Sequence, residues 1–299
     1  MPSNLPTNDP PGAERAGTLY VVATPIGNMD DITLRALRIL EKVDRIAAED
    51  TRHTGKLLAH HQIKKRLISY HEHNEEERTA ELVQRLKAGE SIALVSDAGT
   101  PSVSDPGYRL IYEAIAGNIA VIPIPGVSAA ITALSVSGLP TDSFTFIGFP
   151  PKKRGKRRER LERLSRENRT LVFYESPKRI LAFMDEIATI MGDRFAVLGR
   201  EMTKTYEEII RGSLSEIRDR LQERPSLKGE CTLLVAGPED GEDDLTETIK
   251  EEIKARLGKR GTRLSDVVKE LAEKYSLPKR QVYREALKIK RGMQKMNHA

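Results

Sequence analysis

Residues 93–115 read ALVSDAGTPSVSDPGYRLIYEAI, a stretch that begins as an apolar strand and ends as an amphipathic helix. The segment between them, SDAGTPSVSDPGY at 96–108, holds two Asp, two Gly and two Pro. A β-turn takes only about four residues, so this connection is far longer than a turn requires. Because open α/β sheets bind ligands at the carboxyl ends of their strands, we expect this loop to line a binding site.

The residue types in the loop limit what it can bind. Gly99 and Gly107 let the backbone approach a ligand closely, and the two prolines restrict the loop before binding. Asp97 and Asp105 could accept hydrogen bonds from a ribose or an amine. The loop has no Lys or Arg, and the chain has no GxGxxG or GxxxxGK[ST] motif, which argues against a dinucleotide or triphosphate site. The alternative is an Asp-capped turn that binds nothing.

Outward from this loop, apolar runs alternate with amphipathic patterns, as in a largely parallel sheet that is covered on both faces. Asp30 or Asp31 is the expected N-cap of the first helix. The expected strands lie in 18–27, 44–50, 91–97, 120–126, 142–151, 169–177, 194–202 and 229–237, and the expected helices in 30–43, 77–90, 108–118, 127–138, 178–191 and 213–224.

These elements divide the chain into two α/β halves and a helical tail. Beyond an acidic stretch, two further helical patterns surround the sequence YSLPK at 275–279, a weak match to a helix-turn-helix unit. The predicted parts are a disordered leader at 1–16, an N-terminal α/β subdomain at 17–124, a C-terminal α/β subdomain at 125–237, a linker at 238–244 and a basic helical extension at 245–299.

The composition is typical of a soluble globular protein. Of the 299 residues 38% are hydrophobic, and no window approaches eighteen uninterrupted apolar residues, so no membrane span is expected. The leader lacks the apolar region of a signal peptide. A single cysteine, Cys231, excludes an internal disulfide and a cysteine-based zinc site. Together these features predict a cytoplasmic protein.

The basic residues are clustered. The net charge is +5, but residues 152–169 carry ten Lys or Arg against three Glu, and residues 259–295 carry twelve against four acidic residues. Such clusters are typical of proteins that bind polyanions, since neutralised phosphates release their counterions. The alternative interpretation is a solvated helix face.

A series of motifs then resembles a known family: TPIGN, AEDTRHTGKLL, YHEHNE, LVSDAGTPSVSDPG, PIPGVSA, FIGFPPKK, FYESPKRI, REMTKTYEE and GECTLLVAG. This series, at about 17–237, resembles the tetrapyrrole methylases, and within them the branch that methylates a ribose 2′-hydroxyl of small-subunit ribosomal RNA. The resemblance implies two α/β subdomains with an S-adenosylmethionine cleft between them, and a homodimer. It also implies that the target is a cytidine of the decoding region, in RNA or in the assembled small subunit.

The resemblance also implies which residues contact the cofactor. They follow strand ends in several of the quoted motifs. The expected contacts are Pro25, Asp97, Ala98, Gly99, Val103, Ser128, Ala129, Tyr174, Ala236 and Gly237.

Transfer of a methyl group to a ribose hydroxyl benefits from a base that removes the proton. Glu49, Asp50 and His71 follow strand ends and are candidates, with none favoured over the others. Alternatively, Asp50 and Arg52 pair to orient their loop. His71 and His73 lack a third ligand at a fitting spacing, so no metal site is expected.

The segment KKRGKRR at 152–158 is expected to leave a strand as a loop and to contact RNA phosphates without touching the cofactor. Its cations are Lys152, Lys153, Arg154, Lys156, Arg157 and Arg158. Two other functions stay open at this point. One is a tetrapyrrole C-methyltransferase with the same fold, and the other is a non-catalytic nucleic-acid-binding protein that uses the helical extension.

Overall fold

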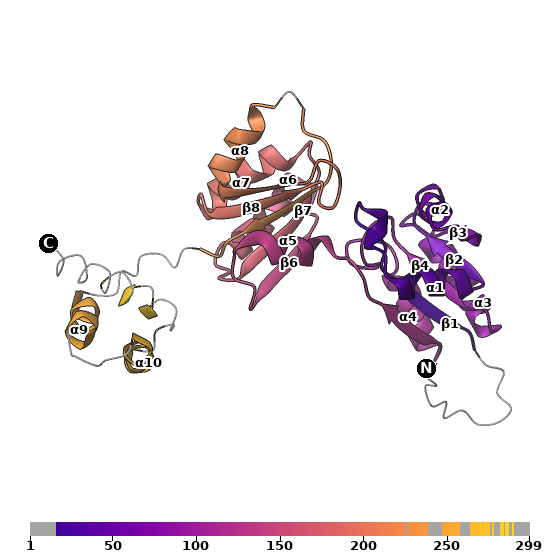
Figure 1. Cartoon of the computed structure of the whole chain (residues 1–299), viewed down its shortest axis with the longest axis horizontal. Helices are drawn as coiled ribbons and strands as arrows, with labels where there is room; N and C mark the ends of the chain where they lie inside the picture. The colour runs from indigo at the N-terminus through magenta and orange to yellow at the C-terminus, as the bar shows by residue number, and fades with distance from the viewer. Residues whose placement is uncertain are drawn as a thin grey trace. The chain divides into compact units, whose positions relative to one another are not determined.

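The computed structural model describes residues 16–224, 226–238, 247–257 and 264–275, together with residues 277, 282, 283, 285, 286 and 289. The chain forms two compact units, whose elements are labelled in Figure 1. The larger unit runs to Leu164 and includes Arg169–Ala236, so it contains both predicted α/β halves. The smaller unit consists of Ser165–Asn168 and the chain from Gly237 onward.

The first half is a five-stranded parallel sheet with the strand order β3-β2-β4-β1-β5. All four residues of β4 are buried, as its uninterrupted apolar run predicts for a central parallel strand. The loops after β1 and β4 therefore begin at neighbouring positions on one edge of the sheet. The strands are β1 (Thr18–Val22), β2 (Arg45–Ala48), β3 (Arg66–Ser69), β4 (Ile92–Val95) and β5 (Ala120–Ile124).

Helices cover both faces of this sheet, as predicted. Leu40 and Leu57 belong to one buried cluster, which α1 and α2 form with the sheet, while Leu82 and Leu110 belong to another, which α3 and α4 form with it. The helices are α1 (Leu34–Lys42), α2 (Thr51–His60), α3 (Glu75–Lys87) and α4 (Tyr108–Ala116), and a 3-10 turn, η1, spans Met29–Asp31.

The predicted cap of the first helix is wrong. Thr33 is the N-cap of α1, and its hydroxyl accepts a hydrogen bond from the Ala36 amide at 3.1 Å. Asp30 and Asp31 instead lie in η1, whose own cap is Asn28. The β-region backbone of Ile32 separates this short turn from α1 and delays the start of the helix.

The second half is a mixed sheet with the strand order β6-β7-β10-β8-β9. β6 and β7 are parallel, whereas β10 runs antiparallel to both of its neighbours and β9 is antiparallel to β8. The edge strand β9 was not predicted, because EIIRGS has only two successive apolar residues. The strands are β6 (Phe144–Gly148), β7 (Thr170–Glu175), β8 (Phe195–Arg200), β9 (Glu208–Ser213) and β10 (Cys231–Val235).

The helices of the second half also lie on both faces. Leu161, Phe183 and Ile217 come from α6, α7 and α8 and share one buried cluster. On the opposite face, Leu134 of α5 packs in a cluster that includes Ile26 from the first half. The helices are α5 (Ala129–Ser137), α6 (Arg154–Leu164), α7 (Ile180–Met191) and α8 (Leu214–Gln222).

The smaller unit is helical and has a core of its own. Its helices are α9 (Glu247–Leu257) and α10 (Leu264–Tyr275), and Ile253 and Leu271 are fully buried. Glu252 of α9 binds Lys274 of α10 at 2.9 Å. The predicted leader and linker lie, apart from residues 16 and 238, outside the described residues. None of the helices described here is long and apolar enough to cross a bilayer.

Candidate active site

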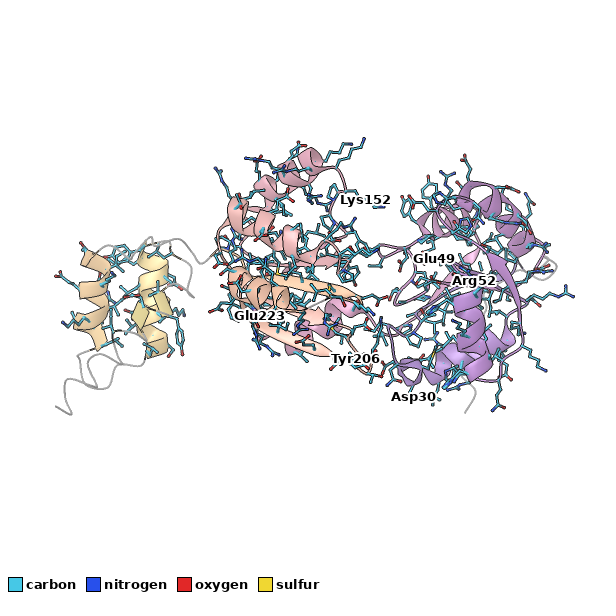
Figure 2. The ribbon with its side chains drawn as sticks, turned by 90° about the horizontal axis from the view of Figure 1, so that it is seen from above. Asp30, Glu49, Arg52, Lys152, Tyr206 and Glu223 are labelled. Carbon is cyan, nitrogen blue, oxygen red and sulfur yellow. The ribbon has the colours of Figure 1, made fainter. Side chains whose placement is uncertain are left out.

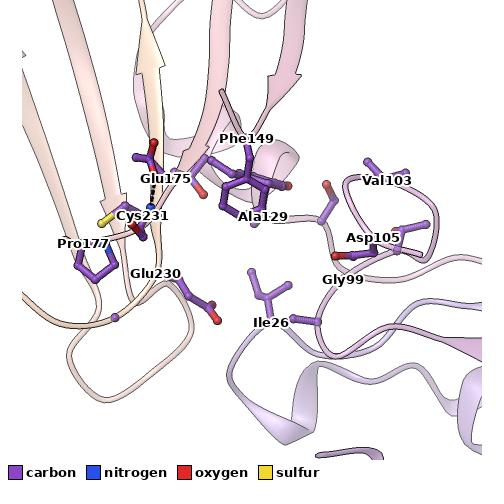
Figure 3. A pocket seen from close by; sticks show the side chains of 17 residues that line it. Ile26, Gly99, Val103, Asp105, Ala129, Phe149, Glu175, Pro177, Glu230 and Cys231 are labelled. Carbon is purple, nitrogen blue, oxygen red and sulfur yellow. Dashed lines mark hydrogen bonds between the residues drawn. The ribbon is translucent and has the colours of Figure 1, made fainter. Parts of the chain in front are cut away.

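Loops beside the strands of the two sheets, together with the ends of β7 and β10, line a cavity of about 390 Å³, called the main cavity below. Figure 3 shows Asp105, Val103 and Gly99 on one side of it and Phe149, Glu175 and Cys231 on the other. A volume of this size is typical of small-molecule sites. The lining residues are Ile26, Ala98, Gly99, Thr100, Val103, Asp105, Ser128, Ala129, Phe149, Tyr174, Glu175, Ser176, Pro177, Gly229, Glu230, Cys231 and Thr232.

The 96–107 loop is fixed to the loop after β1. Thr24 and Gly99 exchange two backbone hydrogen bonds of 2.8 and 3.0 Å, and the Thr24 hydroxyl donates to the Ser96 carbonyl at 3.0 Å. The Ser102 amide donates to the Pro106 carbonyl at 3.2 Å, which closes the far end of the loop. The expectation of a rigid loop that lines a site, rather than a capped turn, therefore fits this geometry.

Two serines of the loop, Ser102 and Ser104, have φ of 67° and 69°, in the left-handed region. That region is uncommon for residues other than Gly and Asn, and such conformations persist where surrounding structure imposes them. At Gly107 φ is 136°, and a Cβ would lie 2.8 Å from Leu94 Cδ2. The loop thus requires glycine at its last position, where α4 begins.

The polar side of the main cavity is acidic. Asp105, Glu175 and Glu230 line it, and among its lining residues there is no Lys or Arg. Glu175 is nearly fully buried and is bound by Arg179 at 2.5 Å. Burial, together with the neighbouring charge of Glu49, raises the pKa of Asp105 to about 7. This set of side chains suits a ligand that carries positive charge.

The apolar side is built around an aromatic pair. The Tyr174 and Phe149 ring centroids lie 5.6 Å apart, and Phe149 is 53% exposed. The Tyr174 hydroxyl accepts a hydrogen bond from the Ala130 amide at 3.2 Å, which ties the ring to the first turn of α5. Val103 and Ile26 complete a surface on which a flat, weakly polar group could rest.

The predicted cofactor residues fall into three groups. Ala98, Gly99, Val103, Ser128, Ala129 and Tyr174 line the main cavity. Pro25 and Asp97 line a second cavity of about 130 Å³, which shares Ile26, Ala98 and Glu230 with the main one. Ala236 and Gly237 line neither cavity: the Ala236 amide donates to the Phe195 carbonyl, and Gly237 packs against the backbone of Asn168.

Asp97 connects two loops of the first half by hydrogen bonds. Its carboxylate accepts a hydrogen bond from the Asp50 amide at 3.0 Å, and its own amide donates to the Glu49 carboxylate at 3.3 Å. The side chain thus joins the loop after β4 to the loop after β2. Contact between Asp97 and the cofactor stays a prediction.

The sequence indicates Asp105 only as a hydrogen-bond acceptor and does not predict Glu175, Phe149 or Glu230 as lining residues. Glu175 ends β7 within the motif FYESP, so its position at a strand end was visible in the sequence. Phe149 and Glu230 lie in loops beside strands, and nothing local distinguishes them from other loop residues. Only the meeting of the two sheets brings them to one cavity.

The three candidate bases have different surroundings, and none of them lines the main cavity. Asp50 is the N-cap of α2 and binds Arg52 at 2.7 Å, which holds the pKa of its carboxyl well below the ordinary value. Burial raises the pKa of Glu49. The His71 Nδ1 atom is buried without a hydrogen-bond partner among the described residues.

The predicted loop at 152–158 is wrong in its secondary structure, because α6 begins at Arg154. Arg157 binds Glu186 at 2.6 Å and donates to the Pro151 carbonyl, so it anchors the start of the helix. Arg158 binds Glu162 one turn later at 2.8 Å. Figure 2 shows Lys152 on the second half of the unit and Glu49 and Arg52 on the first.

The other four cations of the segment at 152–158 form a separate group. They are exposed, none lines either of the two cavities, and in the described part of the chain none takes part in an ion pair. These cations are Lys152, Lys153, Arg154 and Lys156. No group of three or more side chains suited to a metal ion occurs within the described ranges.

Comparison with known proteins identifies the family. Residues 18–218 match the family model of the Tetrapyrrole (Corrin/Porphyrin) Methylases, about two thirds of the chain. The chain belongs to the tetrapyrrole methylase family. The resemblance that the sequence motifs carry is thus confirmed, and with it the two-sheet α/β fold.

Two curated relatives are similar over nearly their full length. Ribosomal RNA small subunit methyltransferase I of Halalkalibacterium halodurans is 48% identical over 273 residues, which cover 89% of this chain and 93% of that protein. The protein of the same name from Synechocystis sp. is 48% identical over 276 residues, with 91% and 98% covered.

Solved structures of other tetrapyrrole methylases share the fold. Methyltransferase CobJ aligns with a TM-score of 0.57 at 18% identity and covers 74% of this chain and 94% of its own. Uroporphyrin-III C-methyl transferase of Thermus thermophilus, solved with S-adenyl homocysteine, aligns with a TM-score of 0.52 at 20% identity and covers 74% and 97%.

The predicted cofactor, S-adenosylmethionine, is confirmed by the family. The main cavity fits this group, because it combines an apolar, aromatic wall with three carboxylates and lacks Lys and Arg. S-adenosylmethionine carries a sulfonium and an ammonium group, which acidic side chains stabilise. When bound, it supplies an electrophilic methyl group.

Proposed function

We propose that this protein transfers a methyl group from S-adenosylmethionine to a ribose 2′-hydroxyl of small-subunit ribosomal RNA, with a cytidine of the decoding region as the expected target. The observation that carries the proposal is the near-half identity to relatives named ribosomal RNA small subunit methyltransferase I, which extends over about nine tenths of both chains. The choice of the ribose oxygen and of the cytidine rests on the motif resemblance.

The charge distribution supports an RNA substrate. The acidic main cavity suits the cationic cofactor and would repel a phosphate backbone, whereas the exposed cations at the start of α6 would attract it. We propose that Lys152, Lys153, Arg154 and Lys156 contact RNA phosphates. Two cations of the predicted set are omitted: Glu186 and two backbone carbonyls already occupy the Arg157 guanidinium, and Glu162 pairs with Arg158.

Within the cavity, the proposed cofactor contacts come from rigid loops on both sheets. The backbone of Ala98 and Gly99 and the side chains of Val103 and Tyr174 would hold the cofactor, and the carboxylates would face its positive groups. Residues of both sheets would contact the cofactor. The protein would therefore act mainly by orienting the methyl group toward the ribose oxygen. A cytoplasmic homodimer is part of the same proposal.

The test is methyl transfer from tritium-labelled S-adenosylmethionine to three substrates: naked small-subunit RNA, assembled small subunits and uroporphyrinogen. We expect label in RNA, recovered after alkaline digestion as a dinucleotide that resists cleavage, since a 2′-O-methyl group blocks attack by that oxygen. Label in uroporphyrinogen would support the tetrapyrrole alternative. Label in neither, with RNA still bound, would support a non-catalytic RNA-binding protein.

A further inference from the structure

The wall of the main cavity contains a carboxylate that no described cation neutralises. Asp105 lines the cavity, and Figure 3 shows its side chain directed from the 96–107 loop toward the open space. The other two lining carboxylates each have a cation: Glu175 binds Arg179, and Glu230 binds Lys204 at 3.1 Å. No ion pair within the described ranges includes Asp105.

The surroundings of Asp105 are themselves acidic. Glu49 and Asp97 come from the loops after β2 and β4, and Glu230 comes from the segment before β10; each of these charges disfavours a second negative charge at Asp105. Tyr174 also lies within electrostatic range, and a hydrogen bond with the Ser96 side chain favours the carboxylate. Burial is the main cause of the raised pKa of about 7, and the repulsion adds to it.

The backbone holds this side chain in place. The Ser102–Pro106 hydrogen bond and the left-handed Ser104 bracket Asp105 on the loop, and the bridge between Thr24 and Gly99 fixes the other end of the loop. A group that must receive a proton from a positioned substrate needs such a fixed location. A carboxylate that titrates near neutral pH also has the proton affinity that this task requires.

We propose that Asp105 is the general base of the reaction and accepts the proton of the ribose 2′-hydroxyl. The inference rests on the proposed function. As the ribose oxygen forms its bond to the methyl carbon, the carbon–sulfur bond breaks and its electron pair stays on sulfur, which becomes neutral. The hydroxyl proton passes to a carboxylate oxygen of Asp105, and water takes it up after the product leaves.

The other candidates are placed less well for this step. Glu49 accepts a hydrogen bond from the Asp97 amide and does not line the main cavity. Asp50 is held ionised by Arg52, so it is a weak base at neutral pH. His71 does not line the main cavity. Of these four groups, Asp105 is the one that lines the main cavity.

The test compares Asp105→Asn with Asp219→Asn, a matched change on the exposed surface of α8. With saturating cofactor and RNA, we expect Asp105→Asn to lower the single-turnover rate by roughly 10²- to 10⁴-fold, the usual contribution of a general base. In the wild type the rate should rise with pH to a plateau at or below about pH 7, because the bound sulfonium lowers the pKa of Asp105. Asp105→Asn should lose this rise. Asp219→Asn should retain both the rate and the rise.

A binding measurement tests the same group without catalysis. Because the cationic cofactor favours ionised Asp105, its affinity in the wild type should increase by up to about tenfold per pH unit as pH rises toward 7. This increase should be smaller in Asp105→Asn, measured by calorimetry on the variant after its melting temperature shows that it is folded. Asp105→Ala serves as a second variant if the amide destabilises the loop.

The possible outcomes distinguish a failure of the Asp105 assignment from a failure of the proposed function. If the wild type methylates a ribose and Asp105→Asn keeps its rate within about threefold with the same pH profile, Asp105 is not the base and the proposed function stands. If the wild type transfers no label to any ribose, the proposed function fails, and the role of Asp105 fails with it. A lost rate together with an unchanged pH dependence of cofactor binding would also contradict the assignment, since it would reduce Asp105 to a structural role.

Discussion

Replacement of Gly107 by alanine tests whether the backbone geometry of the 96–107 loop is required. At φ 136° an alanine is strained, which costs about 1–3 kcal/mol of unfolding free energy. Its Cβ would also lie 2.8 Å from Leu94 Cδ2, and Leu94 is 1% exposed within the packed core of the first sheet. Overpacking of this kind costs about 1–3 kcal/mol, so we expect a total loss of roughly 2–6 kcal/mol.

Two other glycines separate these contributions. Gly138 has φ 77° at the end of α5, and a Cβ added there would have no neighbouring atom within 4 Å, so Gly138→Ala reports backbone strain alone. We expect it to cost about 1–2 kcal/mol. Gly155 in α6 has neither strain nor neighbours within 4 Å, and Gly155→Ala should stabilise the protein by about 0.5–1 kcal/mol, because alanine is the better helix former.

The three variants are compared by urea unfolding followed by circular dichroism, with cofactor affinity measured in parallel by calorimetry. We expect stability to decrease in the order Gly155→Ala, Gly138→Ala, Gly107→Ala, and cofactor affinity to decrease only in the last, since its loop lines the main cavity. Equal stability of Gly107→Ala and Gly138→Ala would refute the argument, because the contact with Leu94 would then have no cost.

Three further predictions concern charge. Neutralisation of the four exposed cations of the segment should weaken RNA binding and flatten its log–log salt dependence by about 2.8 units, at about 0.7 per phosphate, with cofactor affinity unchanged; filter binding at several salt concentrations checks this. Glu175→Gln should weaken cofactor binding roughly tenfold in calorimetry, as expected when one charge-assisted contact is lost. Arg52→Ala should destabilise the protein at neutral pH, and the difference from wild type should shrink as pH falls below about 4: the pKa of Asp50 is depressed in the folded state, so its pairing is lost on acidification. Equal thermal-melting differences at pH 7 and at about pH 2 would contradict this last expectation.

The candidate site was only partly predictable. The 96–107 loop was recognisable because a long segment rich in Gly, Pro and Asp follows a buried strand, and six of the ten predicted cofactor residues do line the main cavity. Asp97 illustrates the limit. Its residue type and position suit ligand binding, yet its carboxylate accepts the Asp50 amide, a partner 47 positions away that only the neighbouring strands bring near.

Local sequence patterns did not predict α6 at its observed start or β9, because both elements depend on contacts with neighbouring elements. The run KKRGKRR has no amphipathic pattern, yet α6 begins within it, because Arg157 reaches Glu186 of α7 and Leu161 packs into the core of the second half. The strand β9 has little apolar character of its own and is held by its antiparallel ladder with β8. Both are stabilised by tertiary contacts that exceed their weak intrinsic preference.

The sequence by itself determined the alternation of strands and helices, the parallel first sheet, the position of the ligand loop and the family, because each follows from local periodicity or from short motifs. Only the tertiary structure decided which of the three lining carboxylates has no ion pair among the described residues. Glu175, Glu230 and Asp105 all carry a carboxyl group, but Arg179 and Lys204 reach the first two, while Asp105 faces the main cavity within electrostatic range of three other acidic groups. The proton affinity of a carboxyl depends on burial and on charges a few ångströms away, and those distances are set only when the two sheets pack together.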